Sequence, residues 1–163
     1  MHHSLGYRVK RRTLLRSGGS AIVLTALVAA GWLKPGSARA QAWNKAAFDT
    51  HDLGEALKAL GAVEPAQSTD IVFAQTPEIA ENGAVVPIGV VSNIAKTQSI
   101  AILIEKNPNP LAAVFDIPPG TEPALSTRVK MAQTSKVYAL VKADGKSYVA
   151  TKEIKVTLGG CGG

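Results

Sequence analysis

Residues 136–158 read KVYALVKADGKSYVATKEIKVTL and contain the clearest structural signal in the sequence. Apolar residues recur at every second position from 137 to 141 and again from 154 to 158. A period of two residues is typical of a β-strand that buries one face. Asp144-Gly145, between the two runs, is a strong signal for a two-residue hairpin turn. The stretch therefore predicts two antiparallel strands joined by a tight turn.

Short β-branched runs of the same kind, separated by turn residues, extend back to residue 71. The seven predicted strands are Ile71–Gln75, Val85–Ser92, Ser99–Glu105, Ala112–Asp116, Ser126–Ala132, Lys136–Lys142 and Tyr148–Leu158. No helical pattern alternates with them, so the sequence predicts a mainly β fold, an immunoglobulin-like antiparallel β-sandwich. A small barrel is the alternative. Thr76-Pro77 resembles the start of a helix, and a single helical turn is expected over Glu78–Glu81.

One amphipathic helix is predicted ahead of the strands, from about Lys45 to Leu60. Its apolar residues fall close to one helical face, as in Phe48 and Leu57. Gly61 stands where the first residue after a helix end is commonly glycine. The resulting organisation has four parts, namely a targeting segment at 1–40, a helical segment at 41–61, a β-sandwich at 62–158 and a C-terminal arm at 159–163.

The first forty residues have the features of an export signal. Arg11-Arg12 precede an apolar run of thirteen residues, Ala21–Leu33, which is shorter than the roughly 20 residues that a membrane-spanning helix needs. Ala38-Arg39-Ala40 has the small-x-small form of a cleavage site. The segment is expected to be a twin-arginine signal peptide, cleaved after residue 40, that directs the protein to the periplasm without a membrane anchor. An uncleaved anchor is the alternative.

The positive charge of the chain belongs to this signal. The sequence has a formal net charge of +6, but residues 1–40 hold seven basic and no acidic residues. The remaining 123 residues hold eleven basic and twelve acidic residues. A nearly neutral mature chain gives no support to a nucleic-acid partner, because such binding depends on basic surfaces.

Few residues offer chemistry. Cys161 is the single cysteine, which excludes an intrachain disulfide and zinc or haem motifs that need several cysteines. His51 is expected to be an exposed histidine, and Glu78 and Glu81 a solvated pair. No carboxylate cluster suggests a metal site. The sequence therefore predicts no cofactor, no metal and no catalytic residues, so the chain is not expected to be an enzyme.

The tail LGGCGG, residues 158–163, is the remaining candidate site. A free cysteine is usually buried, but four glycines leave almost no side chain to pack around Cys161. Gly159, Gly160, Gly162 and Gly163 are expected to form a flexible arm, because glycine loses the most entropy on ordering. A thiol on such an arm can carry a covalently attached substrate between active sites.

Four internal blocks of sequence accompany this tail. They are Pro77–Pro87, Lys106–Leu111, Arg128–Met131 and Lys142–Lys146. Together with the tail and the twin-arginine signal, they resemble the SoxY family, the sulfur-carrier subunit of a periplasmic thiosulfate-oxidising system. The resemblance extends over most of the mature chain. For the stretch Glu78–Pro87, a turn at Asn82-Gly83 that leads into an apolar strand is a sufficient structural explanation, and a place at the partner interface is the alternative.

The resemblance implies a specific role for the tail. In the family, a haem-containing SoxAX-type enzyme oxidatively joins thiosulfate to the tail cysteine, which gives an S-thiosulfonate. A SoxB-type hydrolase then releases sulfate and leaves a persulfide, which a SoxCD-type enzyme oxidises where it is present. Cys161 carries over as the covalent attachment site. The resemblance also implies a heterodimer with a SoxZ-like β-sandwich subunit.

Two other functions remain compatible with the residues themselves. The first is a stand-alone periplasmic thiol oxidoreductase, which requires a base that lowers the pKa of the thiol. The second is a β-sandwich interaction module in which Cys161 forms an intermolecular disulfide.

Overall fold

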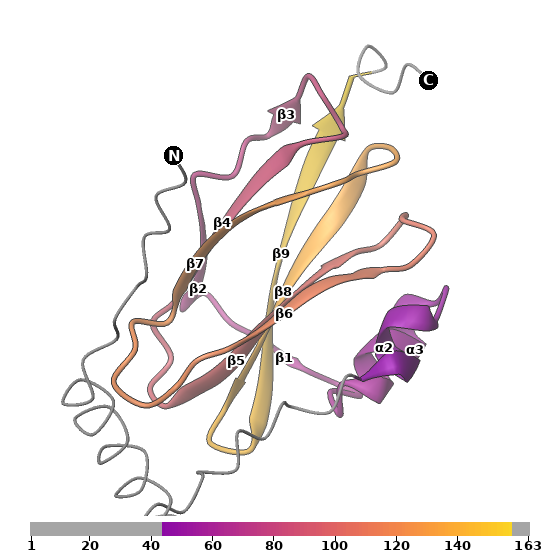
Figure 1. The fold of residues 1–163 in the computed structure, drawn as a ribbon. Coiled ribbons are helices and arrows are strands. Elements are labelled where there is room, and N and C mark those ends of the chain that lie inside the picture. Colours follow the sequence, from indigo (N-terminus) through magenta and orange to yellow (C-terminus); the bar gives the residue numbers. More distant parts are fainter. Residues whose placement is uncertain (1–43, 158–163) are drawn as a thin grey trace, which may run out of the picture. The chain divides into compact units, whose positions relative to one another are not determined.

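The computed structural model describes residues 44–157, which form two short helices and then nine strands (Figure 1). The helices are α2 (Lys45–Asp49) and α3 (Leu53–Ala59). The strands are β1 (Ala66–Gln67), β2 (Ile71–Ala74), β3 (Ile79–Ala80), β4 (Val86–Ser92), β5 (Thr97–Ile104), β6 (Leu111–Asp116), β7 (Ala124–Val129), β8 (Ser135–Ala143) and β9 (Lys146–Val156).

The strands form two sheets that share one apolar core. The larger sheet has the order β1-β9-β8-β5-β6, and the smaller has the order β2-β4-β7. The chain passes from one sheet to the other at every connection from β1 to β5, and again between β6 and β7 and between β7 and β8. All the longer strands pair antiparallel, whereas β1 and β3 add short parallel pairings to the outer edge of β9. These connections are those of an immunoglobulin-like sandwich, so the predicted fold class is confirmed.

Every second residue of the facing strands fills the core between the sheets. The core includes Ile100, Ile102 and Ile104 of β5 together with Ile88 and Val90 of β4, all with 0% exposed surface. Burial of each such side chain contributes about 1.5–3 kcal/mol to folding. The alternation predicted for residues 137–141 has the same origin, because its apolar positions also lie in this core.

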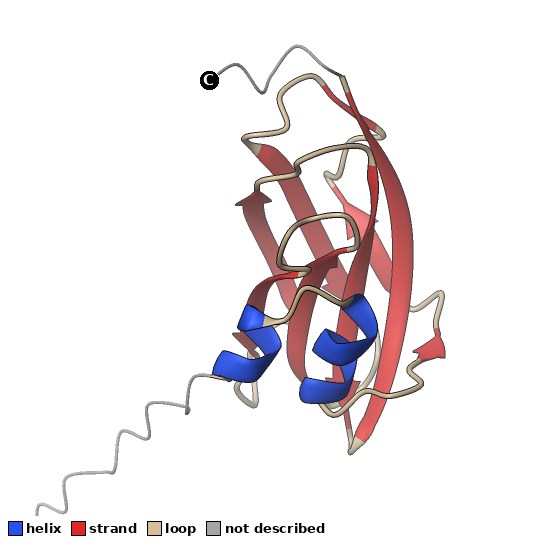
Figure 2. Cartoon of the chain, turned by 90° about the vertical axis from the view of Figure 1, so that its right-hand side faces the viewer, coloured by secondary structure: helices blue, strands red, loops and turns tan. Residues whose placement is uncertain are grey.

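The two helices pack on the opposite face of the larger sheet (Figure 2). There Leu103 of β5 and Leu140 of β8 lie in a second apolar cluster with Ala47, Ala56 and Leu60 of the helical segment. Strands β5 and β8 are thus buried on both faces. This is why residues 100–104 read IAILI without polar interruption.

All seven predicted strands are present, as β2 and β4 to β9, with their ends within three residues of the predicted ones. The predicted hairpin turn is also confirmed. Asp144 and Gly145 both have positive φ, of 50° and 76°, which is the geometry of a type I′ turn. The pairings of β1 and β3, two residues each, were not predicted.

The prediction of one continuous helix from Lys45 to Leu60 is wrong, because the chain leaves helical geometry at Thr50. The second helix begins with its own cap, in which Asp52 Oδ1 accepts a hydrogen bond from the Glu55 N–H at 2.8 Å. Thr50 Oγ1 donates to Glu55 Oε2 at 2.7 Å and accepts from the Asp52 N–H at 3.2 Å. The predicted end at Gly61 is confirmed, because Gly61 has a φ of 69°.

The helical turn expected over Glu78–Glu81 is also wrong. Residues Ile79–Ala80 are extended and pair in parallel with Lys155–Val156 of β9. Thr76 does not cap a helix, because its hydroxyl accepts from the Gly89 N–H in the smaller sheet at 3.0 Å. The chain after Thr76 therefore continues in extended form along the edge of the larger sheet.

Among residues 44–157, no helix is long and apolar enough to cross a membrane.

Candidate functional site

The predicted attachment site, Cys161, and the predicted arm residues Gly159, Gly160, Gly162 and Gly163 lie outside the described residues. The structure describes the residues that lead into this arm, namely the end of β9 at Val156 and the next residue, Thr157. We call these residues the arm base. This base lies beside β3 at one end of the sandwich (Figure 1). The geometry of the base defines where the C-terminal segment begins.

The arm base is hydrogen-bonded on both sides. On the outer side, the Lys155 N–H donates to Glu78 O at 2.9 Å and the Thr157 N–H donates to Ala80 O at 3.1 Å. On the inner side, the Val156 N–H donates to Thr134 Oγ1 at 3.0 Å. Ile154, with 0% exposed surface, anchors the same strand in the core. The chain is therefore fixed in the sheet as far as Thr157, four residues before Cys161.

The segment that holds the outer side of the arm base is itself tied to the smaller sheet. Gln75 has a φ of 50°, which turns the chain over Gly89 of β4. Thr76 Oγ1 lies 3.0 Å from Gly89 N, and Thr76 O accepts from Lys152 Nζ at 2.7 Å. Residues 75–81 thus connect the smaller sheet to β9 across one edge of the sandwich. This gives the first half of the block Pro77–Pro87 a structural role at the arm base.

The second half of that block forms a turn beside the connection between β7 and β8. Asn82 Oδ1 accepts from the Ala84 N–H at 2.9 Å, as expected for the predicted Asn82-Gly83 turn. Gly83 O accepts from the N–H of the buried Met131 at 2.7 Å. A turn explains these residues structurally. Their place at a partner interface stays a prediction.

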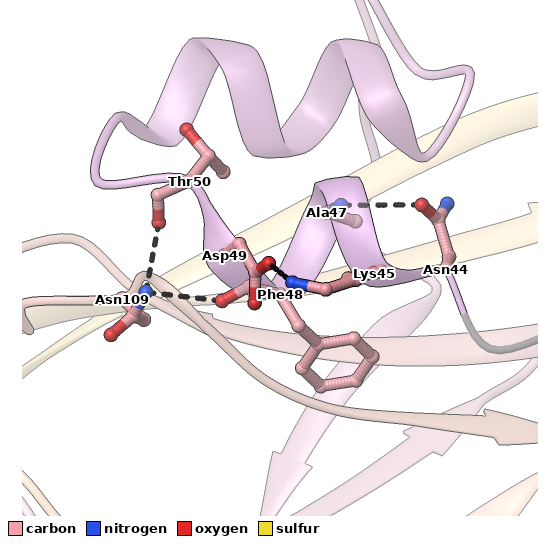
Figure 3. A network of polar contacts seen from close by, with 7 residues as sticks. All are labelled: Asn44, Lys45, Ala47, Phe48, Asp49, Thr50 and Asn109. Atoms are coloured by element: carbon pink, nitrogen blue, oxygen red, sulfur yellow. Dashed lines mark hydrogen bonds and ion pairs between the residues drawn. The ribbon is translucent and has the colours of Figure 1, made fainter.

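The block Lys106–Leu111 connects three parts of the fold. Asn107 Nδ2 donates to Lys130 O at 2.7 Å, and Asn107 Oδ1 accepts from the Ala132 N–H at 3.1 Å. Asn109 Nδ2 donates to Phe48 O at 3.1 Å and to Thr50 O at 3.4 Å, where α2 ends (Figure 3). One asparagine thus holds the connection after β7, and the other holds the helical segment.

The amide of Asn109 is expected to stabilise the end of α2. Substitution Asn109→Ala removes two hydrogen bonds to main-chain carbonyls, each with a net value of about 0.5–1.5 kcal/mol. We expect the free energy of unfolding to fall by about 1–2 kcal/mol in urea denaturation. Asn93→Ala, at an exposed loop position, is the control and is expected to change it by less than about 0.5 kcal/mol. Equal losses in the two variants would contradict this role.

The other titratable residues considered as candidates are either exposed or hydrogen-bonded within the fold. His51 is exposed as predicted, although it lies between the helices, and its Nδ1 is 2.6 Å from Pro108 O. Burial, followed by the neighbouring Glu105 carboxylate, raises the pKa of Tyr138, so this phenol stays protonated at neutral pH. Glu78 and Glu81 are exposed, also as predicted. Within the part of the chain that the structure describes, no group of three or more His, Cys, Asp or Glu residues could hold a metal ion.

A shallow hollow lies directly beside the arm base. Its lining residues are Glu78, Ile79, Lys152, Glu153 and Lys155. The hollow has a mixture of both charges, and Ile79 leaves 57% of its surface exposed there. Residues 78–81 were considered only as part of a possible partner interface, and Lys152 was not predicted as part of a site. Their only sequence signal is the block Pro77–Pro87, whose contacts with β9 involve residues more than seventy positions away.

The fold and the site together define a class of protein, an immunoglobulin-like β-sandwich whose last strand is fixed up to a glycine-rich C-terminal segment with one cysteine. The family model described as sulfur oxidation protein SoxY matches residues 56–161. This chain belongs to the SoxY family.

Comparisons with solved structures agree with this assignment. The structure of the sulfur carrier protein SoxY from Chlorobium limicola f thiosulfatophilum has a TM-score of 0.59 and 40% sequence identity to this chain, and the match covers 66% of this chain and 97% of that one. A structure described as the basis of T cell specificity and activation by the bacterial superantigen toxic shock syndrome toxin-1 has a TM-score of 0.39 and 17% identity, over 53% of this chain and 99% of that one, and this TM-score is too low to support an argument. No curated protein matches the chain.

Proposed function

We propose that this chain is a covalent carrier of sulfur intermediates in thiosulfate oxidation. Cys161 is the attachment site, and Gly159, Gly160, Gly162 and Gly163 form the arm around it. The observation that carries the proposal is the family match, because it extends through residue 161. The similar structure described as a sulfur carrier protein supports the same role.

The arm base supports the proposal by its geometry. Thr157 is the last residue of the described strand edge, and four residues of chain span at most ~13 Å at ~3.3 Å per residue. This distance lets the thiol of Cys161 extend beyond the sandwich into the active site of another protein. The fixed strand keeps the starting point of the arm constant, while glycine side chains add no bulk beside the sulfur.

The proposed chemistry takes place on one sulfur atom. In the loading step, the Cys161 sulfur forms a bond with the outer sulfur of thiosulfate, one proton leaves the thiol, and two electrons pass to the haem-containing SoxAX-type enzyme, which acts as the oxidant. In the second step, a SoxB-type hydrolase adds water across the bond between sulfur and the sulfonate group. Sulfate leaves with the water oxygen, and a persulfide remains on Cys161. A SoxCD-type enzyme, where present, oxidises this persulfide sulfur.

The proposal includes partners and a compartment. The carrier forms a heterodimer with a SoxZ-like β-sandwich subunit and docks transiently to the enzymes of the cycle, which supply the catalytic groups. Residues 1–40 direct export to the periplasm by the twin-arginine pathway and are then removed. The mature chain needs neither a cofactor of its own nor a nucleic-acid partner.

Intact mass spectrometry tests the proposal directly. After incubation of the carrier and its partner subunit with thiosulfate and a SoxAX-type enzyme, we expect the neutral mass to increase by one S2O3 unit, because the thiol hydrogen is lost and the new sulfonate group carries one proton. The increase is expected to map to the C-terminal peptide and to disappear after reduction, because the new sulfur–sulfur bond is reducible. Cys161→Ser is expected to abolish the increase completely.

A second measurement separates this function from the alternatives. The Cys161→Ser chain is expected to fold with unchanged circular dichroism, since the substituted position follows the described fold. Complete thiosulfate oxidation with the Cys161→Ser variant would overturn the proposal. A disulfide-linked dimer with no thiosulfate adduct would instead favour the interaction module.

A further inference from the structure

Three exposed basic residues lie towards the end of the sandwich that holds the arm base: Arg128 on β7, Lys130 directly after β7, and Lys106 in the loop after β5. Pro87 pairs with Arg128, and Val86 pairs with Val129. Val85 directly precedes β4, and Lys130 directly follows β7, so these two residues come next to the last pair of the ladder. Arg128 and Lys130 are both exposed, while Val129 between them points into the core. The two basic side chains thus lie on the outer side of the smaller sheet.

Lys106 joins these residues through the asparagine next to it. Asn107 Nδ2 donates to Lys130 O at 2.7 Å, so the loop after β5 is held against the main chain at Lys130. Lys106 is also exposed, and its N–H donates to Ser135 Oγ at 3.0 Å. Exposed basic residues from two separate sequence blocks thus lie at one end of the sandwich, and we call them the basic surface of Lys106, Arg128 and Lys130.

No acidic partner neutralises this basic surface within residues 44–157. The ion pairs in that range are Lys45–Asp49 and Lys96–Asp144, and neither involves the three residues. Glu105, which precedes Lys106, accepts a hydrogen bond from Tyr138 at 3.5 Å. The remaining 123 residues after the signal are nearly neutral overall. The net charge of the domain therefore does not explain why these three basic residues lie together.

The basic surface has an apolar part and adjoins the arm base. Val85 leaves 51% of its surface exposed, and Pro87 is exposed beside Arg128. An exposed apolar centre with a charged rim is typical of a protein-binding surface. Met131, which follows Lys130, is hydrogen-bonded to Gly83, and Thr134 is hydrogen-bonded to the arm base at Val156. A protein that contacts this surface is therefore close to the start of the arm.

We propose that the basic surface of Lys106, Arg128 and Lys130 docks an acidic protein surface on the enzyme that loads thiosulfate onto Cys161. This inference rests on the proposed carrier function. Charge complementarity selects the partner, because three unpaired cations attract a surface rich in Asp and Glu. It also favours a transient enzyme over the permanent subunit, since charged rims mainly accelerate encounter whereas the centres of permanent interfaces are depleted of charge.

A charge-reversal experiment tests the docking surface. The double variant Lys106→Glu/Lys130→Glu is compared with Lys58→Glu/Lys146→Glu, which makes the same change in net charge at exposed positions elsewhere. The rate of Cys161 loading by a purified SoxAX-type enzyme is followed by intact mass spectrometry at low carrier concentration. We expect the first variant to lose at least about tenfold in kcat/KM at low salt and the control variant to lose less than about twofold. The difference is expected to shrink at about 0.5 M NaCl, where charges are screened.

The outcomes separate the two proposals. Normal loading of the Lys106→Glu/Lys130→Glu variant, or equal losses in both double variants, would overturn the docking surface and leave the carrier function intact. If the unsubstituted protein takes up no thiosulfate at Cys161, the carrier function fails and the docking inference fails with it. Circular dichroism and denaturation of both variants confirm that the loss is not caused by unfolding.

Discussion

Gly89→Ala is expected to destabilise the sandwich by about 3 kcal/mol or more, a larger effect than overpacking usually produces. A Cβ at this position would lie 2.1 Å from the main-chain oxygen of Ala74 and 3.0 Å from its carbonyl carbon. Both are backbone atoms of the paired strand β2, so the clash cannot be relieved by a side-chain rotation. Strand β2 must move away from β4.

The displacement of β2 would also break a buried hydrogen-bond arrangement. Thr76, with 8% exposed surface, places its hydroxyl 3.0 Å from Gly89 N. Separation of these atoms leaves a buried N–H without its partner, which costs about 1–3 kcal/mol. Because Thr76 O also accepts from Lys152, the strain is transmitted to β9 and the arm base.

Thermal and urea denaturation of the isolated chain measure the effect of Gly89→Ala. A loss of about 3 kcal/mol corresponds to a fall in Tm of roughly 10–20 °C for a domain of this size. Ser126→Ala is the matched control, because Ser126 pairs with Gly89 across the sheet and is exposed. This control is expected to change stability by less than about 0.5 kcal/mol. A loss below about 1 kcal/mol for Gly89→Ala would contradict the close approach of β2.

The strands were predictable from the sequence because their burial repeats locally. Residues 137–141 alternate since one face of β8 lies in the core, and Asp144-Gly145 has the turn geometry that its residue types favour. The parallel pairings of β1 and β3 were not predictable in this way. Each involves two residues, too few to show a period, and their partners on β9 are more than seventy positions away in the sequence.

The two wrong predictions have different physical causes, one a contact distant in the sequence and the other a local helix cap. Thr76-Pro77 has the residue types of a helix start, but the Thr76 hydroxyl bonds Gly89, thirteen positions away. The break after α2 had a local signal, the N-cap residue Asp52, which the apolar spacing of the segment concealed. Asn109 strengthens the same break from a loop 59 positions away.

The candidate site also has a part that could be predicted from the sequence and a part that could not. Cys161 and its glycines are recognisable from composition alone, because four glycines provide no side chains that could pack around the one thiol. The basic surface is not recognisable from composition, since the side chain of Asn107 holds the loop that contains Lys106 against Lys130, 23 positions further along the sequence than Asn107. Such surfaces require the tertiary structure.

Deletion of Gly159 and Gly160 is expected to reduce the loading of Cys161 about a hundredfold or more. The described strand is fixed as far as Thr157, so the deletion leaves the cysteine two residues beyond this point instead of four. The maximum reach of the chain then falls from ~13 Å to ~7 Å. A displacement of even about 1 Å from the productive position can reduce a rate a hundredfold, and this change is several times larger.

Two controls distinguish reach from other effects of the deletion. Gly159→Ser/Gly160→Ser keeps the length of the arm and is expected to retain most of the loading rate, whereas the deletion does not. Alkylation of Cys161 by iodoacetamide, a reagent that diffuses to the thiol, is expected to proceed at the same rate in all three proteins. Because the deleted residues follow the fixed strand, the free energy of unfolding is expected to stay within about 0.5 kcal/mol of the starting protein. Loading of the deletion variant at the full rate would mean that the enzyme reaches the sulfur at the surface of the sandwich, and the arm would then have no role in delivery.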